Sequence, residues 1–246
     1  MPLSEHLREL RNRLLVCAVL LLASTLAGLH FAPRIVEILL EIGKSYQYRF
    51  VYIAPQELLM QYFSTALLIG ICITLPVLFY ETWACVRPGL RKNENLIFLL
   101  SMIFGLLCFC LGVWFAYRVM LPFMLYFLAS VGVGSGISAA VSVQNYMTFL
   151  MTVFLVFGIV FELPVISILL TRMGLLHVSW MRKGRRVVIV LIFVAAALIT
   201  PPDVVSQIMV AIPMLVLYEV SILLCTAVQK LRDRAEKKRE EKAKNK

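Results

Sequence analysis

Two glutamates lie deep inside long apolar segments of the chain, Glu162 within residues 146–170 and Glu219 within residues 204–228. A charged side chain at the centre of a bilayer costs roughly 2.5–3.5 kcal/mol on insertion scales, so such residues usually face a cavity, a partner or a transport pathway. A carboxylate in that position can accept hydrogen bonds from a polar guest or carry a proton. The two glutamates are therefore the first candidates for a functional role inside a membrane.

The helix face around Glu162 carries further polar side chains. At 100° per residue, Gln144 and Thr148 lie within about 40° of Glu162. This stripe allows two interpretations: a protonated Glu162 that bonds a neighbouring helix and holds the bundle together, or a surface that receives a polar group from a partner helix. The residues favour neither. The face around Glu219 is less polar, which favours a packing role.

A second candidate site lies at the start of the chain. Leucines recur every three or four residues from Leu3 to Leu14, which predicts a short amphipathic helix over residues 1–13. Glu5 and Glu9, four residues apart, would present an acidic spot to a basic ligand. Alternatively the charges simply face water, with Glu9 paired to Arg13.

No catalytic or metal-binding motif accompanies these acids. The six Cys lie inside or beside apolar segments and the three His are scattered, so neither a disulfide framework nor a metal site is predicted. The sequence also lacks a glycine-rich phosphate-binding loop that ends in Lys and Ser or Thr. We expect a protein that is not an enzyme and uses no cofactor and no metal ion.

Composition indicates a membrane protein. Hydrophobic residues make up 61% of the chain and charged residues 15%, with a mean hydropathy of +0.88. A spanning helix needs about 20 mostly apolar residues, and backbone polar groups in lipid must be paired within helices or a closed barrel. The apolar runs lack period-two alternation, which excludes a barrel and predicts an all-α membrane protein with six transmembrane helices. The runs are 14–32, 58–79, 96–120, 146–170, 187–199 and 204–228.

Basic residues predict the orientation of these helices. Of the 24 Lys and Arg residues, all but four fall before the first run, in the 83–95 and 172–186 connections, or after residue 228. The exceptions are Arg34, Lys44, Arg49 and Arg118. The positive-inside rule then places both termini in the cytoplasm. Because this asymmetry and attraction to anionic lipids explain the net charge of +10, no nucleic-acid partner is expected.

The sequence predicts one domain with a tail. Residues 1–229 are expected to form a single six-helix transmembrane domain, and residues 230–246 a basic cytoplasmic tail with helical character. On the exported side, Pro33, Gly43 and Pro55 break the 33–57 connection, which contains a predicted surface helix. A second exported loop is predicted over residues 126–143.

The fifth run is short. It has 13 residues between Arg186 and Thr200, about 20 Å of helix against a hydrocarbon core of roughly 30 Å. The chain returns at Thr200-Pro201-Pro202-Asp203, where Asp203 can cap the next helix. Short fifth and sixth helices would thus form a hairpin that thins the bilayer beside it. Prolines within or near four other runs predict a bent, concave scaffold.

Four motifs, in order along the chain, resemble the TatC family, the multi-spanning subunit of the twin-arginine protein translocase. They are His6-Leu7-Arg8-Glu9-Leu10-Arg11-Asn12-Arg13, Pro88-Gly89-Leu90-Arg91-Lys92-Asn93-Glu94, Phe161-Glu162-Leu163-Pro164-Val165, and Thr200-Pro201-Pro202-Asp203 followed by Ser206-Gln207. Each motif alone is weak, but the ordered set covers nearly the whole chain. In the segment from Tyr52 to Leu59, this sequence has Leu59 where the family often has an aromatic residue.

The resemblance implies a receptor for twin-arginine signal peptides in the bacterial inner membrane. Glu9, Glu94 and Arg11 match the signal-peptide site, while Pro55, Pro88 and Asp203 match structural turns. Arginine forms strong charge-assisted hydrogen bonds to carboxylates, which agrees with this assignment. Alternatively, Glu94 only stabilises the start of the third helix through its dipole.

The resemblance also implies partners: TatA- and TatB-like single-span proteins, further copies of the same chain, and the lipid bilayer. The rival interpretation is a proton-coupled secondary transporter of a small solute, with Glu162 and Glu219 as proton or substrate sites. Inverted repeats would support a transporter, and none is convincing between residues 1–125 and 126–246.

Overall fold

The computed structural model describes residues 3–46, 48–86, 95–132, 140–200 and 203–244 and is almost entirely helical. Its contacts form two compact units. The first, unit 1, comprises residues 1–106 and 113–155, and the second, unit 2, comprises residues 107–112 and 156–246. Two helices, α3 (Asn95–Phe115) and α5 (Val143–Phe161), contribute residues to both.

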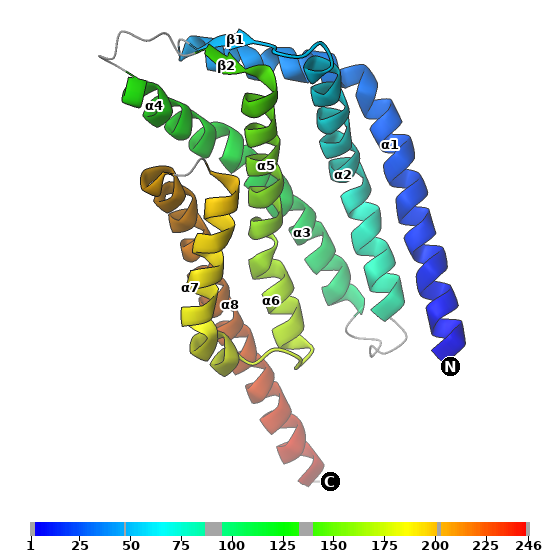
Figure 1. The fold of residues 1–246 in the computed structure, drawn as a ribbon. Helices are drawn as coiled ribbons and strands as arrows, with labels where there is room; N and C mark the ends of the chain where they lie inside the picture. Colours follow the sequence, from blue (N-terminus) through cyan, green and yellow to red (C-terminus); the bar gives the residue numbers. More distant parts are fainter. Residues whose placement is uncertain (1–2, 47, 87–94, 133–139, 201–202, 245–246) are drawn as a thin grey trace. The chain divides into compact units, whose positions relative to one another are not determined.

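Unit 1 is built on two long helices, α1 (Leu3–Ser45) and α2 (Glu57–Val86), which lie side by side over most of their length (Figure 1). Small residues allow the close approach. The Ser24 hydroxyl lies 3.2 Å from both the Gly70 carbonyl and the Thr74 hydroxyl. A Cβ on Gly28 would come within 3.0 Å of the Ala66 carbonyl oxygen. Small residues at helix contacts are the usual means of packing inside a membrane.

Helix α1 is one continuous element, which corrects two predictions. The amphipathic segment 1–13 and the expected surface helix after Pro33 are its two ends, not separate helices. Pro33 lies inside α1. In Figure 1 the helix bends so that its last part crosses the top of unit 1. Proline removes one backbone hydrogen bond and clashes with the preceding turn, so it bends a helix without having to end it.

The third apolar run continues further than predicted. After α3 comes a five-residue π-helical segment (Ala116–Met120) and then α4 (Leu121–Gly132). The prediction of a loop from residue 126 is therefore wrong for residues 126–132, and residues 133–139 lie outside the described part. Residues 121–131 are apolar enough to extend the helix, and Pro122 stands at its second position, where a missing N–H is tolerated.

A small sheet, which the sequence did not predict, is the one strand pairing in the described part of this otherwise helical chain. Strand β1 (Arg49–Val51) pairs in parallel with β2 (Ala140–Ser142). Tyrosines fasten helices near this sheet: the Tyr48 hydroxyl donates to the Leu125 carbonyl at 3.1 Å, and the Tyr146 hydroxyl donates to the Leu39 carbonyl at 2.9 Å. Burial raises the pKa of the Tyr48 phenol, which keeps this hydrogen bond donor protonated.

Unit 2 contains α6 (Leu163–Arg172), α7 (Val178–Ile199) and α8 (Val204–Lys244), with both α6 and α7 packed on α8. The prediction of short fifth and sixth helices is wrong for the helices as wholes, which have 22 and 41 residues. Only the apolar part of α7 is short. Lys, Arg and Glu are good helix formers, so the backbone hydrogen bonds continue into the charged segments.

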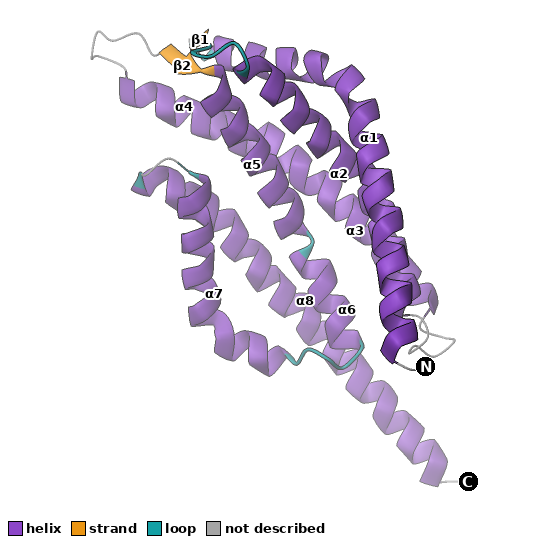
Figure 2. Cartoon of the chain, turned by 45° about the vertical axis from the view of Figure 1, so that its right-hand side comes forward, coloured by secondary structure: helices purple, strands orange, loops and turns teal. Residues whose placement is uncertain are grey.

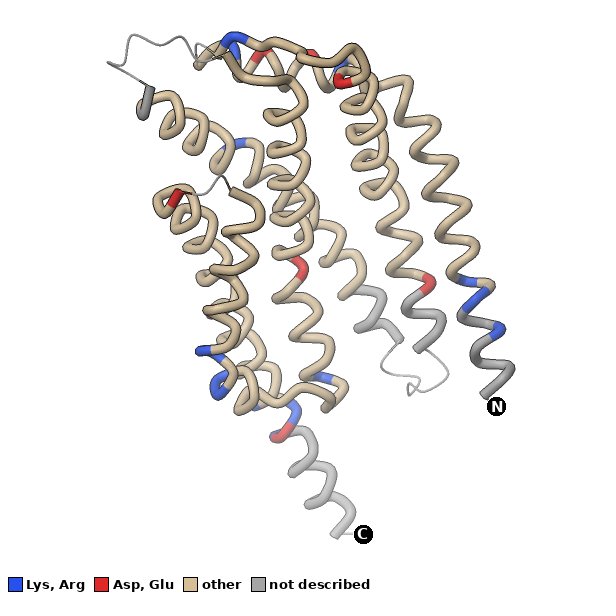
Figure 3. The backbone as a smooth tube through the Cα atoms, viewed as in Figure 1, with Lys and Arg blue, Asp and Glu red and all other residues tan. Residues whose placement is uncertain are grey.

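Five helical segments of the described chain are long and apolar enough to cross a membrane: 11–45, 57–81, 101–130, 143–172 and 204–234. The prediction of six spans included α7, whose first half carries Arg182, Lys183, Arg185 and Arg186. Figure 3 shows the same pattern, with Lys and Arg in the N-terminal halves of α1 and α7 and long uncharged stretches after them.

Candidate functional site

The first candidate site lies at the N-terminal end of α1. Arg8 and Arg11 are exposed there. Glu9 lies in the same helical turn, and its side chain lies outside the described part of the structure. Glu94 and Pro88 lie outside the described residues, so the proximity of Glu9 and Glu94 remains a prediction.

One ion pair connects this end of α1 to α2. The Arg13 guanidinium donates to the Glu81 carboxylate at 2.7 Å, and the two side chains are only 23% and 17% exposed. Sequence analysis offered Glu9 as one possible partner of Arg13 and did not consider this pair with Glu81. The signal it missed is that Arg13 and Glu81 are the charges that flank the apolar stretches of neighbouring helices.

The second candidate, Glu162, stands at a break between helices. Figure 2 shows a short turn between α5 and α6, and Glu162 occupies it with φ −76° and ψ −20°. Pro164, two residues later, has no N–H to donate to Val160, so the helical hydrogen-bond ladder is interrupted there. The Glu162 amide instead donates to the Ile159 carbonyl at 3.0 Å.

The Glu162 side chain is buried without a partner. It is 5% exposed, and neither carboxylate oxygen has a hydrogen-bond partner among the described residues. Its surroundings are tightly packed, since the Phe109 ring of α3 lies on Gly158 and the backbone of Phe157 lies against Gly112. A buried polar group without a partner costs about 1–3 kcal/mol, so burial of this carboxyl group lowers the stability of the fold unless a hydrogen-bond donor reaches it.

Gln144 and Thr148 are exposed on α5, and the Thr148 carbonyl accepts a hydrogen bond from the Thr152 hydroxyl at 2.8 Å. Gln144 follows strand β2, and its backbone amide donates a hydrogen bond to the Ser142 hydroxyl at 3.1 Å. They belong to unit 1, whereas Glu162 belongs to unit 2. The predicted polar stripe of these three residues remains a prediction.

Glu219 has a partner that the sequence interpretation did not foresee. The Arg185 guanidinium of α7 donates to the Glu219 carboxylate at 2.7 Å, with both side chains about half exposed. Next to this pair, the Tyr218 hydroxyl donates to the Met181 carbonyl at 2.8 Å. Glu219 therefore helps to join α7 to α8, in agreement with the packing role favoured above.

The two described turn residues lie at the starts of helices. Asp203 accepts a hydrogen bond from the Ser206 amide at 2.6 Å, the interaction of a residue that caps a helix N-terminus. Pro55 is exposed in the loop before α2.

Near Pro55, the buried Glu57 carboxylate accepts hydrogen bonds from the amides of Ile53 and Ala54 and from the Ser142 hydroxyl. The sequence interpretation assigned no role to Glu57. A carboxylate three residues after a turn is the one available signal, and it resembles the second half of a capping box.

Metal ligands do not gather in the described part of the chain. Within it, no group of three or more His, Cys, Asp or Glu side chains could hold a metal ion.

Comparison with known proteins identifies relatives over almost the full length. A family model described as Sec-independent protein translocase protein (TatC) matches residues 5–213. The TatC protein of Desulforapulum autotrophicum is 36% identical over 247 residues, which cover 99% of this chain and 90% of that protein. The TatC protein of Aquifex aeolicus is 37% identical, covering 91% of this chain and 94% of the relative.

Solved structures show the same likeness. The crystal structure of the twin arginine translocase receptor TatC matches with a TM-score of 0.82 at 35% identity, covering 91% of this chain and 99% of that one. A second crystal structure of that receptor, in DDM, matches with a TM-score of 0.83 at 36% identity and covers 89% of this chain and 98% of that chain.

Proposed function

Because the chain belongs to the TatC family of Sec-independent protein translocase proteins, we propose that it binds twin-arginine signal peptides on the cytoplasmic side and acts as receptor and scaffold for the export of folded proteins. Membership of this family makes the chain a multi-span membrane component of a protein translocase, not an enzyme. The family match over residues 5–213, which includes all four motifs, carries the proposal.

The proposed binding chemistry uses two carboxylates. Glu9 and Glu94 each accept hydrogen bonds from one guanidinium of the arginine pair, because arginine and carboxylate form the strongest charge-assisted contacts available to side chains. Arg11, exposed one half-turn from Glu9, would orient the acidic residues or the peptide backbone. The exposure of Arg8 and Arg11 supports an accessible surface at this end of α1.

The proposal includes an arrangement in the bacterial inner membrane with six spans and both termini in the cytoplasm. Alongside the five long apolar segments, α7 would supply the sixth span through its apolar second half. The distribution of Lys and Arg supports this orientation, since positively charged segments remain on the cytoplasmic side.

Glu162 is proposed as an intramembrane contact for partners, together with Gln144 and Thr148. A TatA- or TatB-like single-span helix, or another copy of this chain, would bring a hydrogen-bond donor to Glu162 and a polar group to Gln144 or Thr148. The unpaired carboxylate of Glu162 and the exposure of Gln144 and Thr148 support this assignment.

Peptide binding to the purified full-length protein in lipid nanodiscs tests the proposed receptor role. A fluorescent signal peptide with consecutive arginines should bind, and the same peptide with two lysines should bind more weakly. Glu9→Ala or Glu94→Ala should each weaken binding by roughly tenfold to a hundredfold, the loss of one charge-assisted contact.

Asp233→Ala is a matched control, because Asp233 is an exposed acid on the proposed cytoplasmic part of α8. Unchanged binding by both Glu9→Ala and Glu94→Ala would refute the assignment of the site. Failure of the wild-type protein to bind any twin-arginine peptide, together with uptake of a small solute into vesicles, would instead support a transporter.

A further inference from the structure

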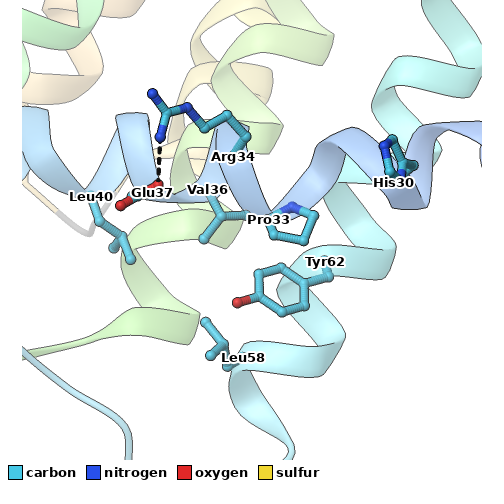
Figure 4. Close-up of a pocket in the computed structure, with 8 residues that line it drawn as sticks. All are labelled: His30, Pro33, Arg34, Val36, Glu37, Leu40, Leu58 and Tyr62. Carbon is cyan, nitrogen blue, oxygen red and sulfur yellow. Dashed lines mark hydrogen bonds and ion pairs between the residues drawn. The ribbon is translucent and has the colours of Figure 1, made fainter.

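A hollow of about 550 Å³, largely open to the surroundings, lies on unit 1 between α1 and α2, and it is distinct from the proposed signal-peptide site; it is called the cavity below. Figure 4 shows its walls: the bend of α1 on one side and the first turns of α2 on the other. The lining residues are His30, Pro33, Arg34, Val36, Glu37, Leu40, Leu58 and Tyr62. Its volume lies within the range of about 300–1,000 Å³ that is typical of small-molecule sites.

Helix length places this cavity at a membrane boundary. From Arg13, which ends the charged start of α1, to Pro33 the helix rises about 30 Å, the thickness of a hydrocarbon core. The cavity therefore lies at the boundary opposite to the N-terminal end of α1, at the depth of lipid headgroups. Tyrosine and arginine commonly occupy this layer of a membrane protein.

The cavity combines apolar walls with a charged rim. Val36, Leu40 and Leu58 supply the apolar part, while Arg34 and Glu37 project from one face of α1. The apolar walls suit a hydrocarbon chain such as the acyl chain of a lipid. The charged rim suits a group that carries both a negative and a positive charge.

The two rim charges are available to a ligand. The Arg34 guanidinium lies 3.2 Å from the Glu37 carboxylate, but the side chains are 77% and 69% exposed. Exposed ion pairs of this kind contribute little to stability, so both partners can exchange their mutual contact for a ligand without a large loss.

We propose that this cavity binds a phospholipid whose headgroup carries a primary ammonium, that is, an ethanolamine phospholipid. The phosphate accepts hydrogen bonds from Arg34 and the ammonium donates to Glu37. The part of one acyl chain nearest the headgroup lies along Leu40 and Leu58. A choline headgroup has no N–H to donate to Glu37. A glycerol headgroup has no positive charge. The choline lipid and the glycerol lipid therefore both keep the contact of the phosphate with Arg34 but lose the charge-assisted hydrogen bond to Glu37.

Native mass spectrometry of the full-length protein, with lipids that differ only in the headgroup, tests the proposal. The ethanolamine lipid should bind at least about fivefold more tightly than the choline or glycerol lipid with the same acyl chains. Arg34→Gln should weaken binding of the ethanolamine and glycerol lipids alike. Glu37→Gln should abolish the preference for ethanolamine over glycerol.

Two matched controls separate this site from the general lipid coat. Glu41→Gln removes an exposed acid one turn further along α1 and outside the cavity, and it should leave the preference intact. Leu58→Trp should fill the cavity and weaken binding, whereas Leu59→Trp, at an exposed neighbour, should not. The thermal unfolding midpoint of each variant shows whether it has folded.

Three outcomes would overturn the proposal: equal binding of all three lipids by the wild type, tighter binding of the glycerol lipid, or equal effects of Glu37→Gln and Glu41→Gln.

Discussion

Arg13 and Glu81, 68 residues apart in the chain, form an ion pair of 2.7 Å that joins the N-terminal end of α1 to α2. Between this pair and the bend at Pro33, α1 rests on α2 through Ser24 and Gly28. The helix that carries Glu9 and Arg11 is thus held at its base by a charged contact.

Breaking the Arg13–Glu81 pair should loosen the proposed signal-peptide site. Arg13→Gln or Glu81→Gln should each lower stability by about 1–2 kcal/mol, between the effects typical of exposed and buried pairs. Either change also removes the charged contact between α2 and the helix that carries Glu9, which should weaken peptide binding.

Thermal unfolding and peptide titration measure these two effects. The charge exchange Arg13→Glu with Glu81→Arg should recover most of the lost stability. A double variant no more stable than the worse single variant would show that the pair contributes nothing.

Glu57 should be the most sensitive charged position at the sheet end of unit 1. Its carboxylate is 5% exposed and accepts three hydrogen bonds. Glu57→Ala should destabilise the protein by about 2–4 kcal/mol because two amides and the Ser142 hydroxyl lose their acceptor.

Ser142→Ala removes only one of those donors and should cost about 1 kcal/mol. Unfolding midpoints of the two variants in the same detergent give the comparison. A larger effect of Ser142→Ala than of Glu57→Ala would contradict this account of the network.

Two helical glycines should respond in opposite directions to alanine. A Cβ on Gly112 would approach the Phe157 carbonyl oxygen to 2.5 Å, a backbone atom that cannot turn away. Gly112→Ala should therefore destabilise unit 2 by about 1–3 kcal/mol. A Cβ on Gly184 in α7 would meet nothing within 4 Å, so Gly184→Ala should stabilise the protein by about 0.5–1 kcal/mol.

Equilibrium unfolding of both glycine variants checks the signs. Equal effects would mean that the helix contact at Gly112 is not as close as the structure has it.

Glu162 should show opposite effects on stability and on export. Glu162→Leu replaces a buried, unpaired carboxyl group with an apolar side chain, a change that is often neutral or stabilising. The same change removes the proposed contact for a partner helix, so export should fall. Glu162→Gln keeps both shape and hydrogen-bonding groups and should retain more export than Glu162→Leu.

Export of a twin-arginine reporter and thermal unfolding, measured in parallel, separate the two effects. Wild-type export from both variants would show that Glu162 serves no partner.

Hydropathy predicted the positions of the helices along the chain better than it predicted their ends. The apolar runs and the helices coincide in their centres, but α1 continues through Pro33, and α4 continues to Gly132. Hydropathy reports which solvent a segment prefers. The end of a helix depends on where its backbone hydrogen bonds stop, and a single proline or a charged turn does not stop them.

The candidate sites divide in the same way. The motifs around Glu9, Glu94 and Glu162 were recognisable in the sequence. Three contacts were not: those of Arg13 with Glu81, of Glu57 with Ser142, and of Glu219 with Arg185. Each of these partners comes from another helix or strand, 68, 85 and 34 residues away along the chain. No local pattern specifies which distant charges meet.

The amino-acid sequence by itself determined that this protein resides in a membrane and belongs to the TatC family, because composition and ordered motifs are properties of the chain alone. Tertiary structure decided that Arg13 meets Glu81, that Glu219 meets Arg185, and that Glu162 is buried with no hydrogen-bond partner in the described part of the chain. The physical reason is that a side chain's charge is local, whereas its partner and its distance from solvent arise only when helices pack.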